Sequence, residues 1–453
     1  MVLGFVGLII VVVGLIHLYI WKRLVRDTFR GRTARRVGAA VVIALAILAP
    51  ATLVGVRSGS VDWLAWPGYL WIALMFYLLV VLAVVEIPRL AISLWIRSRE
   101  RAEARATAPA AESHALETAP SHPASAATAA EEPPATPGPA TETSPATETS
   151  PATETSPATE TSPATKTSPA AENGENSEKA GVDRRLVLAR GAAIFAGLTA
   201  AGITGYGVRT ALAPPQLDRV QLPIAKLPRG MDGTRLAVVS DIHLGPLTGM
   251  RHTERIVAAI NSVNADIVCV VGDMVDGSVA ELGGLAAPLR GIQSRRGAYF
   301  VTGNHEYYSG YQEWVDEVAR LGMRPLRNER VELDGLDLAG VNDINGAEMN
   351  DAPDYARALG DRDTARPVVL MAHQPVAARD AAPYGVDLQV SGHTHGGQMA
   401  PFNLLVKLEQ PVVSGFGEVD GVPVYVTNGA GYWGPPVRVG APPQVTVIEL
   451  RAP

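Results

Sequence analysis

The chain has 453 residues, of which 47% are hydrophobic and 19% charged, with a formal net charge of −6 and a single cysteine, Cys269. This length is enough for two or three domains and excludes a small secreted scaffold. One cysteine cannot form an internal disulfide, so cysteine usage does not indicate the redox compartment. The compartment has to be inferred from membrane topology.

Three apolar segments of membrane-spanning length precede residue 98, over residues 2–20, 37–56 and 64–85. Seven basic residues and one acid lie in residues 22–36, between the first two segments, and arginines also follow the third. Cytoplasmic loops are enriched in Lys and Arg, so both basic stretches belong in the cytoplasm. Residues 1–98 are therefore predicted to form a membrane region with three transmembrane helices.

Residues 99–182 are predicted to form a disordered linker. They are rich in Ala, Pro, Thr and Glu, and the hexapeptide Thr-Glu-Thr-Ser-Pro-Ala repeats from Thr141, with Lys166 replacing Glu in the last copy. No apolar residue larger than Ala recurs in the repeats, so stacked copies would have no core to bury. Such a segment is expected to remain solvated and partly extended.

Residues 183–213 are predicted to form a fourth transmembrane helix or a twin-arginine-like signal anchor. Arg184 and Arg185 precede the uncharged, Ala- and Gly-rich residues 191–208. The alternative is that the two arginines are ordinary cytoplasmic anchors. Both interpretations predict a multi-pass protein of the plasma membrane with its C-terminal half outside the cytoplasm. The twin-arginine export machinery is a candidate partner, and cleavage after Ala211 or Ala213 is left open.

Residues 214–453 are predicted to form one domain, in which apolar runs end in Asp, Asn or His. The domain has 20 Lys and Arg against 28 Asp and Glu, which is no nucleic-acid-binding footprint. The run at 236–239 leads into Asp241 and His243, which face the same side of an extended segment and can reach one metal. The run at 267–271 leads into Asp273 and Asp276.

Three further apolar runs end in the same way, so that five of the nine histidines fall at such ends. The residues that follow these runs are Asn304 and His305, then His373, and then His393 and His395. Burying so many imidazoles and carboxylates without a cation would leave unpaired charge. The order of strands and helices is typical of an α/β domain with a site at the strand ends.

The blocks Asp-x-His, Gly-Asp-x-x-Asp, Gly-Asn-His-Glu, His and Gly-His-Thr-His resemble those that define the calcineurin-like metallophosphoesterases, over nearly all of residues 230–453. Gly396-Gly397-Gln398, the tail around residues 429–433 and the membrane leader are similar to the YkuE-type membrane-associated branch. The resemblance implies a four-layer α/β/β/α sandwich with a dinuclear site at one edge, where loops from both sheets converge.

The resemblance also implies the role of each residue, with two divalent metal ions as cofactors. The first ion would be held by Asp241, His243 and His395, the second by Asn304, His373 and His393, and Asp273 would bridge the two. Carboxylates can span two cations, while imidazole and amide groups complete each shell without excess charge. No cysteine is among the ligands, so Mn²⁺, Fe and Zn²⁺ all fit this set.

The expected reaction is attack on phosphorus by a water that bridges the two cations and has lost a proton. His305 is expected to protonate the leaving oxygen, and Asp276 to orient His305. The alternative for Asp276 is a turn residue before Gly277. The serine/threonine phosphatases of this superfamily carry arginine where Gly277 stands, so phosphoprotein substrates are disfavoured.

The sequence thus predicts a membrane-anchored phosphoesterase that cleaves phosphodiester or pyrophosphate bonds, with lipid- or envelope-linked substrates favoured by proximity. One alternative is a hydrolase of nucleotide-linked acylated sugars that resemble UDP-diacylglucosamine. Another is a catalytically inactive membrane sensor or scaffold, which the complete ligand set disfavours. Transport by the spans has little support, because Glu86 and Arg89 lie at an interface end and His17 is the only His, Asp, Glu, Lys or Arg within the predicted spans.

Overall fold

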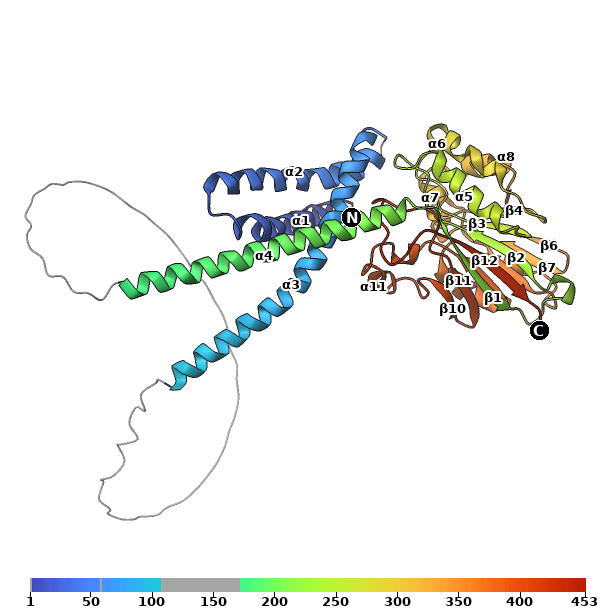
Figure 1. Ribbon diagram of the computed structural model, residues 1–453. Helices are drawn as coiled ribbons and strands as arrows, with labels where there is room; N and C mark the ends of the chain where they lie inside the picture. Colours follow the sequence, from blue (N-terminus) through green and yellow to red (C-terminus); the bar gives the residue numbers. More distant parts are fainter. Residues whose placement is uncertain (1, 58, 107–171) are drawn as a thin grey trace, which may run out of the picture. The chain divides into compact units, whose positions relative to one another are not determined.

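The computed structural model describes residues 2–57, 59–106 and 172–453 (Figure 1). Its N-terminal part is helical. The helices are α1 (Val2–Ile20), α2 (Arg32–Arg57), α3 (Ala65–Ala106) and α4 (Glu172–Ala211), with a π-helical segment, Trp21–Arg26, after α1.

Three helices of the described residues are long and apolar enough to cross a membrane: Arg32–Val56, Asp62–Ala91 and Leu186–Ala211. They coincide with the second, third and fourth predicted spans. Helix α1 covers the first predicted span, and its crossing of a membrane stays a prediction.

The boundaries of the predicted linker need a correction. Helix α3 continues to Ala106 and helix α4 begins at Glu172, so helix extends into both ends of residues 99–182. Glu, Arg and Ala dominate residues 99–106 and are strong helix formers, which the low-complexity argument did not weigh. The hexapeptide repeats from Thr141 to residue 170 lie outside the described residues.

The C-terminal domain contains two six-stranded sheets. The first sheet has the order β1 (Gln216–Pro223), β12 (Gln444–Arg451), β2 (Thr234–Val239), β3 (Ile267–Val271), β4 (Ala298–Val301) and β5 (Arg324–Pro325). The second has the order β10 (Gly415–Val419), β11 (Val422–Val426), β9 (Leu388–Ser391), β8 (Val368–Met371), β7 (Leu336–Gly340) and β6 (Glu329–Leu333).

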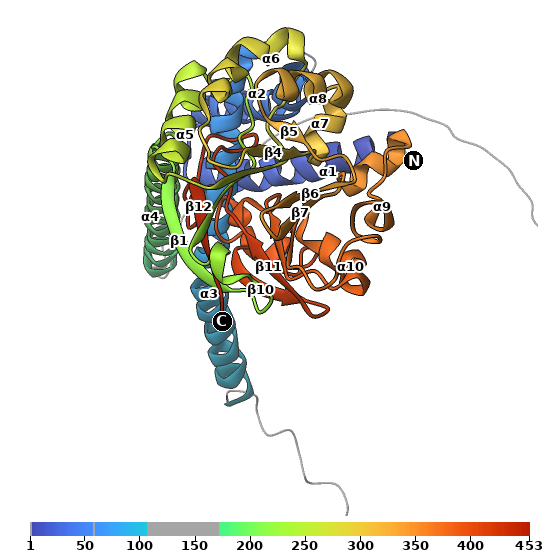
Figure 2. The ribbon, with the colours of Figure 1, turned by 90° about the vertical axis from the view of Figure 1, so that its right-hand side faces the viewer.

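Helices cover the outer face of each sheet, and Figure 2 shows them on opposite sides of the two sheets. Helices α5 (Met250–Ser262), α6 (Val279–Ala286) and α8 (Tyr311–Arg320) pack on the first sheet, and α9 (Tyr355–Leu359) and α10 (Ala378–Ala381) on the second. A third apolar cluster, with Val238, Val369 and Val390 among its members, fills the space between the sheets. The predicted four-layer α/β/β/α sandwich is therefore confirmed.

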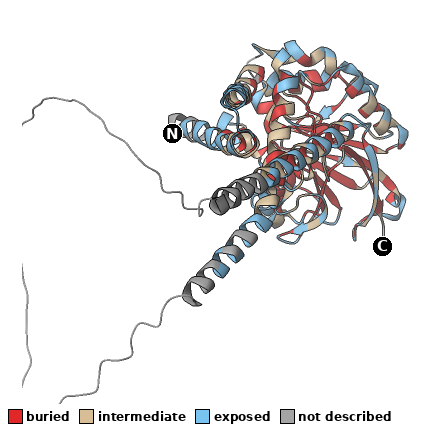
Figure 3. Cartoon of the chain, turned by 60° about the vertical axis from the view of Figure 1, so that its left-hand side comes forward, coloured by how far each residue is buried: buried red, intermediate tan, exposed pale blue. Residues whose placement is uncertain are grey.

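The central strands are buried on both faces, and they appear red in Figure 3. This explains why their sequences are continuous apolar runs rather than alternating ones. Strands β2, β3 and β4 run parallel, as do β7, β8 and β9. Parallel strands end at one edge of a sheet, so the loops that follow them meet there. Short helices α7 (Asn304–Tyr308) and α11 (Asn403–Val406) begin in these loops.

Candidate metal centre

The loops at the carboxyl ends of the strands bring together all the residues predicted for the site. Asp241 and His243 follow β2, Asp273 and Asp276 follow β3, Asn304 and His305 begin α7 after β4, His373 follows β8, and His393 and His395 follow β9. Five of these residues have left-handed backbones with φ between 48° and 69°: Asp241, His243, Asp273, His393 and His395. Non-glycine residues in this region carry strain, which clusters at functional sites.

Asp241, His243 and His395 form the first group of ligand atoms. The His395 Nε2 lies 3.0 Å from His243 Nε2 and 3.4 Å from Asp241 Oδ1. Asp241 is fully buried, and its carboxylate accepts hydrogen bonds from the hydroxyl of Ser240 and the backbone amide of His393. These bonds fix the carboxylate in the direction of the two imidazoles.

A carboxylate sets the tautomer of His243. Its Nδ1 lies 2.8 Å from Asp276 Oδ1. An ionised carboxylate only accepts hydrogen bonds, so Nδ1 carries the proton and Nε2 presents a lone pair. That lone pair is directed at His395 Nε2.

Asp273, His373 and His393 form a second group, beside which lies the Asn304 amide oxygen, 3.1 Å from His393 Nδ1. His373 Nδ1 donates to the backbone carbonyl of Val271 at 2.8 Å, so Nε2 is again the bare nitrogen. The His373 Nε2 atom is buried, has no hydrogen-bond partner and lies 3.1 Å from Asp273 Oδ2. Burial opposes protonation of this ring, but the charge of Asp273 outweighs it and raises the pKa of His373 well above its ordinary value.

The buried Nε2 of His373 tests whether the residues fit metal ions. Arg438 donates to His395 Nδ1, so His395 Nε2 carries a proton and donates it to His243 Nε2. His373 Nε2 has no hydrogen-bond partner, and a proton or a cation between it and Asp273 Oδ2 would satisfy both buried atoms. Both His243 and His373 use Nδ1 to donate to a neighbour, which is the usual arrangement of a histidine that binds metal through Nε2. The donor set of imidazole, carboxylate and amide oxygen suits Mn²⁺, Fe or Zn²⁺, and Asp273 lies between the two groups. The residues fit a dinuclear centre.

His305 lies beside the two groups, at the start of α7. Its Nδ1 is 2.7 Å from Asp276 Oδ1, and its backbone amide donates to Asp273 Oδ1 at 2.8 Å. Burial opposes protonation of the ring, but the charges of Asp273 and Asp276 outweigh it and raise the pKa of His305 to about 9. Asp276 contacts both His305 and His243.

Glu306 ties the loops after β3 and β4 together. Its buried carboxylate accepts hydrogen bonds from the backbone amides of Gly303, Asp273 and Met274. Burial is the main cause that raises the pKa of Glu306, to about 7. Gly303 leaves room for this contact, since a Cβ there would collide with Asp273. The carboxylate thereby fixes the loops that present Asp273 and Asn304.

Arg438 is a site residue that the sequence argument missed. It is fully buried, its Nη2 lies 3.0 Å from His395 Nδ1, and it donates to the carbonyls of His395, Gly431 and Ala441. A signal was present: Arg438 is the only charged residue between Asp420 and Glu449. A lone cation in a stretch rich in Gly and Pro indicates a buried structural partner, because an exposed loop of this length usually carries several charges.

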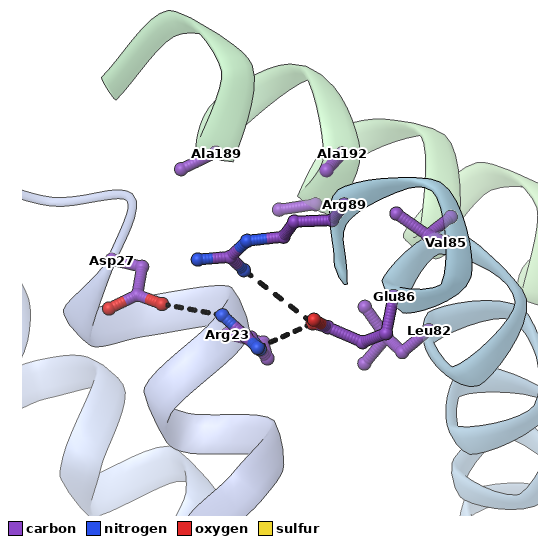
Figure 4. A pocket seen from close by; sticks show the side chains of 9 residues that line it. Arg23, Asp27, Leu82, Val85, Glu86, Arg89, Ala189 and Ala192 are labelled. Atoms are coloured by element: carbon purple, nitrogen blue, oxygen red, sulfur yellow. Dashed lines mark hydrogen bonds and ion pairs between the residues drawn. The ribbon is translucent and has the colours of Figure 1, made fainter. Parts of the chain in front are cut away.

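A second cluster of charges lies at one end of the predicted spans (Figure 4). Arg23 pairs with Asp27 at 3.2 Å and with Glu86 at 2.5 Å, and Arg89 lies 3.5 Å from Glu86. Each acid thus faces a base, and alanines of α4 line the remaining wall. Mutually paired charges at an interface end are an anchoring arrangement and give transport no support.

The comparisons with known proteins agree with this geometry. The family model for calcineurin-like phosphoesterases matches residues 234–397. A metallophosphoesterase from Aquifex aeolicus is 33% identical over 241 residues, which cover 52% of this chain and 92% of the relative. The metallophosphoesterase YkuE from Bacillus subtilis is 29% identical over 276 residues, covering 58% and 94%. The chain belongs to the calcineurin-like metallophosphoesterase family.

Animal relatives combine the same domain with membrane helices. A transmembrane protein with metallophosphoesterase domain from Danio rerio is 38% identical over 274 residues, covering 57% of this chain and 62% of the relative. The chain thus spans about three fifths of that relative's length. This relative is named as a transmembrane protein, and YkuE, which the sequence resemblance indicated, is also among the relatives.

Proposed function

We propose that the protein is a membrane-anchored phosphoester hydrolase that uses two divalent cations, Mn, Fe or Zn. The ligands would be Asp241, His243 and His395 for the first ion and Asn304, His373 and His393 for the second, with Asp273 between them. The observation that carries the proposal is the convergence of three groups of His and Asp ligand atoms, each group within 4.8 Å, together with the buried His373 Nε2 that has no hydrogen-bond partner. Cations bound among these groups would partner the buried nitrogens and carboxylates.

Bound cations would supply a nucleophilic hydroxide at neutral pH and neutralise charge on the phosphoryl oxygens. The chain's own contribution to proton transfer comes from His305. Its Nδ1 is engaged by Asp276, so Nε2 is left to face the substrate. The contact with Asp276, which is not among the proposed ligands, favours the protonated ring. His305 is therefore suited to donate a proton to the leaving oxygen as the P–O bond breaks.

The substrate class we favour is a phosphodiester or a pyrophosphate carried by a lipid or an envelope polymer. The support is the set of candidate spans, one of which ends at Ala211, close to the first strand of the domain. Nucleotide-linked acylated sugars are the alternative, because their pyrophosphate bond suits the same ligand set. A plasma-membrane location with the domain outside the cytoplasm, and delivery by twin-arginine export, follow from the basic residues that precede each outward span.

The test uses the full chain purified in detergent, stripped of metal and then reloaded with Mn²⁺, Fe²⁺ or Zn²⁺. We expect metal-dependent turnover of bis(4-nitrophenyl) phosphate, and a loss of roughly a thousandfold or more in Asp273→Asn. Asp420→Asn is a matched control, since Asp420 is an exposed aspartate with a similar left-handed backbone.

Two results would overturn the proposal. One is turnover that does not respond to metal or to Asp273→Asn. The other is binding of two metal ions with no turnover of diester, monoester or pyrophosphate, which would identify a sensor or scaffold instead. Phosphorus NMR on the same three substrate classes would decide between the favoured substrate and the alternative.

A further inference from the structure

Residues 402–408 form an exposed apolar surface next to the site. Four large side chains within these seven residues are exposed: Phe402 by 45%, Leu404 by 61%, Leu405 by 57% and Leu408 by 83%. The segment is ordered by its own backbone hydrogen bonds, through helix α11 and the turn after it. Apolar side chains gathered in this way on a soluble surface mark a place where another apolar phase binds.

The surface continues from a candidate membrane span. The ring of Phe402 packs edge-on against the ring of Phe76, with 6.5 Å between their centroids. Phe76 lies near the middle of the candidate span Asp62–Ala91, about 20 Å along the helix from its start. The contact therefore brings Phe402 against the apolar surface of a candidate span.

The chain also keeps the domain close to the bilayer. The candidate span Leu186–Ala211 ends only four residues before β1 begins at Gln216, and a chain this short reaches about 17 Å. Within the span, the carbonyl of Gly207 accepts a hydrogen bond from the backbone amide of Arg438 at 2.9 Å. The domain cannot move away from the membrane surface.

We propose that residues 402–408 insert into the same bilayer that the spans cross, and so dock the catalytic domain onto lipid. Leu404, Leu405 and Leu408 would lie among the acyl chains, at the depth of interfacial helices. The charged Lys407 and Glu409 flank Leu408, and Lys407 can extend its ammonium group to the headgroups.

The docking surface is packed against the metal centre itself. Gly397, two residues after His395, lies so close to Asn403 of α11 that a Cβ on this glycine would collide with it. Gln398 binds the backbone of Trp433 at 2.9 and 3.0 Å, and the exposed Trp433 ring lies 6.1 Å from His305. Docking therefore places the side of the site where His305 lies at the lipid surface. This inference rests on the proposed function, and it makes phosphoesters held in the membrane the substrates.

The first test locates the segment in the membrane. The full chain carrying Leu405→Cys is labelled with a fluorophore and reconstituted into vesicles of phosphatidylcholine and phosphatidylglycerol, and Cys269 stays unlabelled because it is fully buried. The control is Arg295→Cys, since Arg295 is exposed and precedes β4 at the opposite end of the sheet. We expect lipid-chain nitroxides to quench the label at 405 several-fold more than the control, and iodide to do the reverse.

Two outcomes would overturn the docking. One is iodide quenching at 405 equal to the control. The other is protection from both quenchers that disappears when the protein is diluted in the vesicles, which would identify a second copy of the chain on this surface. Neither outcome depends on catalysis, so a failure of the proposed function leaves this test valid.

The second test addresses the substrate class with the triple variant Leu404→Glu, Leu405→Glu and Leu408→Glu. We expect a loss of roughly tenfold or more on a chromogenic diester anchored in vesicles, and a change of less than about twofold on soluble bis(4-nitrophenyl) phosphate. Met349→Glu, at another exposed apolar residue, is the control. Equal rates on the anchored diester for the variant and the unchanged chain would refute membrane-held substrates, while absence of soluble turnover in the unchanged chain would refute the proposed function.

Discussion

The two groups of candidate metal-binding residues are held in place by different means. In the first group, charged side chains hold the imidazoles, Asp276 on His243 and Arg438 on His395. In the second group, the backbone carbonyl of Val271 holds His373. A carbonyl in a central strand is fixed by the fold, whereas a side chain can be exchanged. Substitutions of these side chains can therefore change metal affinity and proton transfer at the first group. The contact that holds His373 in the second group depends on the backbone of the sheet and cannot be changed in this way.

The largest effect on activity is expected from the variant Asp276→Asn, which alters the contacts that hold His243 in the first group. Asp276 Oδ1 contacts both His243 and His305, and an amide in its place lacks the negative charge that strengthens both hydrogen bonds. We expect kcat to fall by roughly 10²- to 10⁴-fold with little change in KM, which steady-state kinetics on the soluble diester would measure.

The pH profile of this variant gives a second readout. The charge of Asp276 helps to raise the pKa of His305, so removing it lowers that pKa. Activity needs protonated His305. As the pH rises, the variant should therefore lose activity at a lower pH than the unchanged chain does. An unchanged kcat, or an alkaline limb that does not move, would show that Asp276 is only a turn residue.

Arg438→Lys should lower the affinity of the first group for its metal ion and leave that of the second group unchanged. A lysine cannot make the four contacts of the guanidinium, and loss of an outer partner typically costs 10–100-fold in metal affinity. Elemental analysis after dialysis against a weak chelator should give close to one ion per chain instead of two. Arg320→Lys, on exposed α8, is the control. Equal loss of both ions would contradict the distinction between the groups.

The smallest expected effect is on stability, at His252. This ring lies behind the first group, where it donates to the carbonyl of Ile242, and burial is the main cause that lowers the pKa of His252 to about 4. Below about pH 6.5 the unfolded chain gains a proton that the folded chain does not. Stability should therefore be full above pH 6.5 and fall by about 2 kcal/mol as the pH drops to 4.

The measurement is thermal unfolding of the full chain at several pH values, with His252→Gln as the comparison. Glutamine can still donate a hydrogen bond but does not titrate in this range. The variant should lose less stability between pH 6.5 and pH 4 than the unchanged chain. Parallel curves would mean that His252 does not carry this pH dependence.

Local sequence order was sufficient to predict the five strands that lead into the site, whereas the two-sheet sandwich was implied by the family resemblance. Buried parallel strands are continuous apolar runs, and each of these five ends in a polar block such as Asp241-Ile242-His243. The contact of Asp276 with His243 was not predicted, because it depends on how two loops 33 residues apart in the sequence lie together.

Contacts between residues far apart in the sequence could not be predicted from local patterns. Arg438 follows His395 by 43 residues, and no local pattern links the two. In the membrane region, mean hydropathy located the spans, but the pairing of Arg23 with Glu86 depends on how two helices lie side by side. The helical ends at 99–106 and from Glu172 were missed because low complexity was given more weight than helix propensity.

The left-handed backbones of the metal-binding residues also bear on how the family can change over time. Each such conformation at a side chain with a Cβ costs on the order of 1 kcal/mol, and function alone justifies the cost. A descendant that no longer hydrolysed anything would gain stability by replacing His243, His393 or His395 with glycine or asparagine. Retention of histidine at these strained positions therefore distinguishes members that still hydrolyse a substrate from members that have lost the activity.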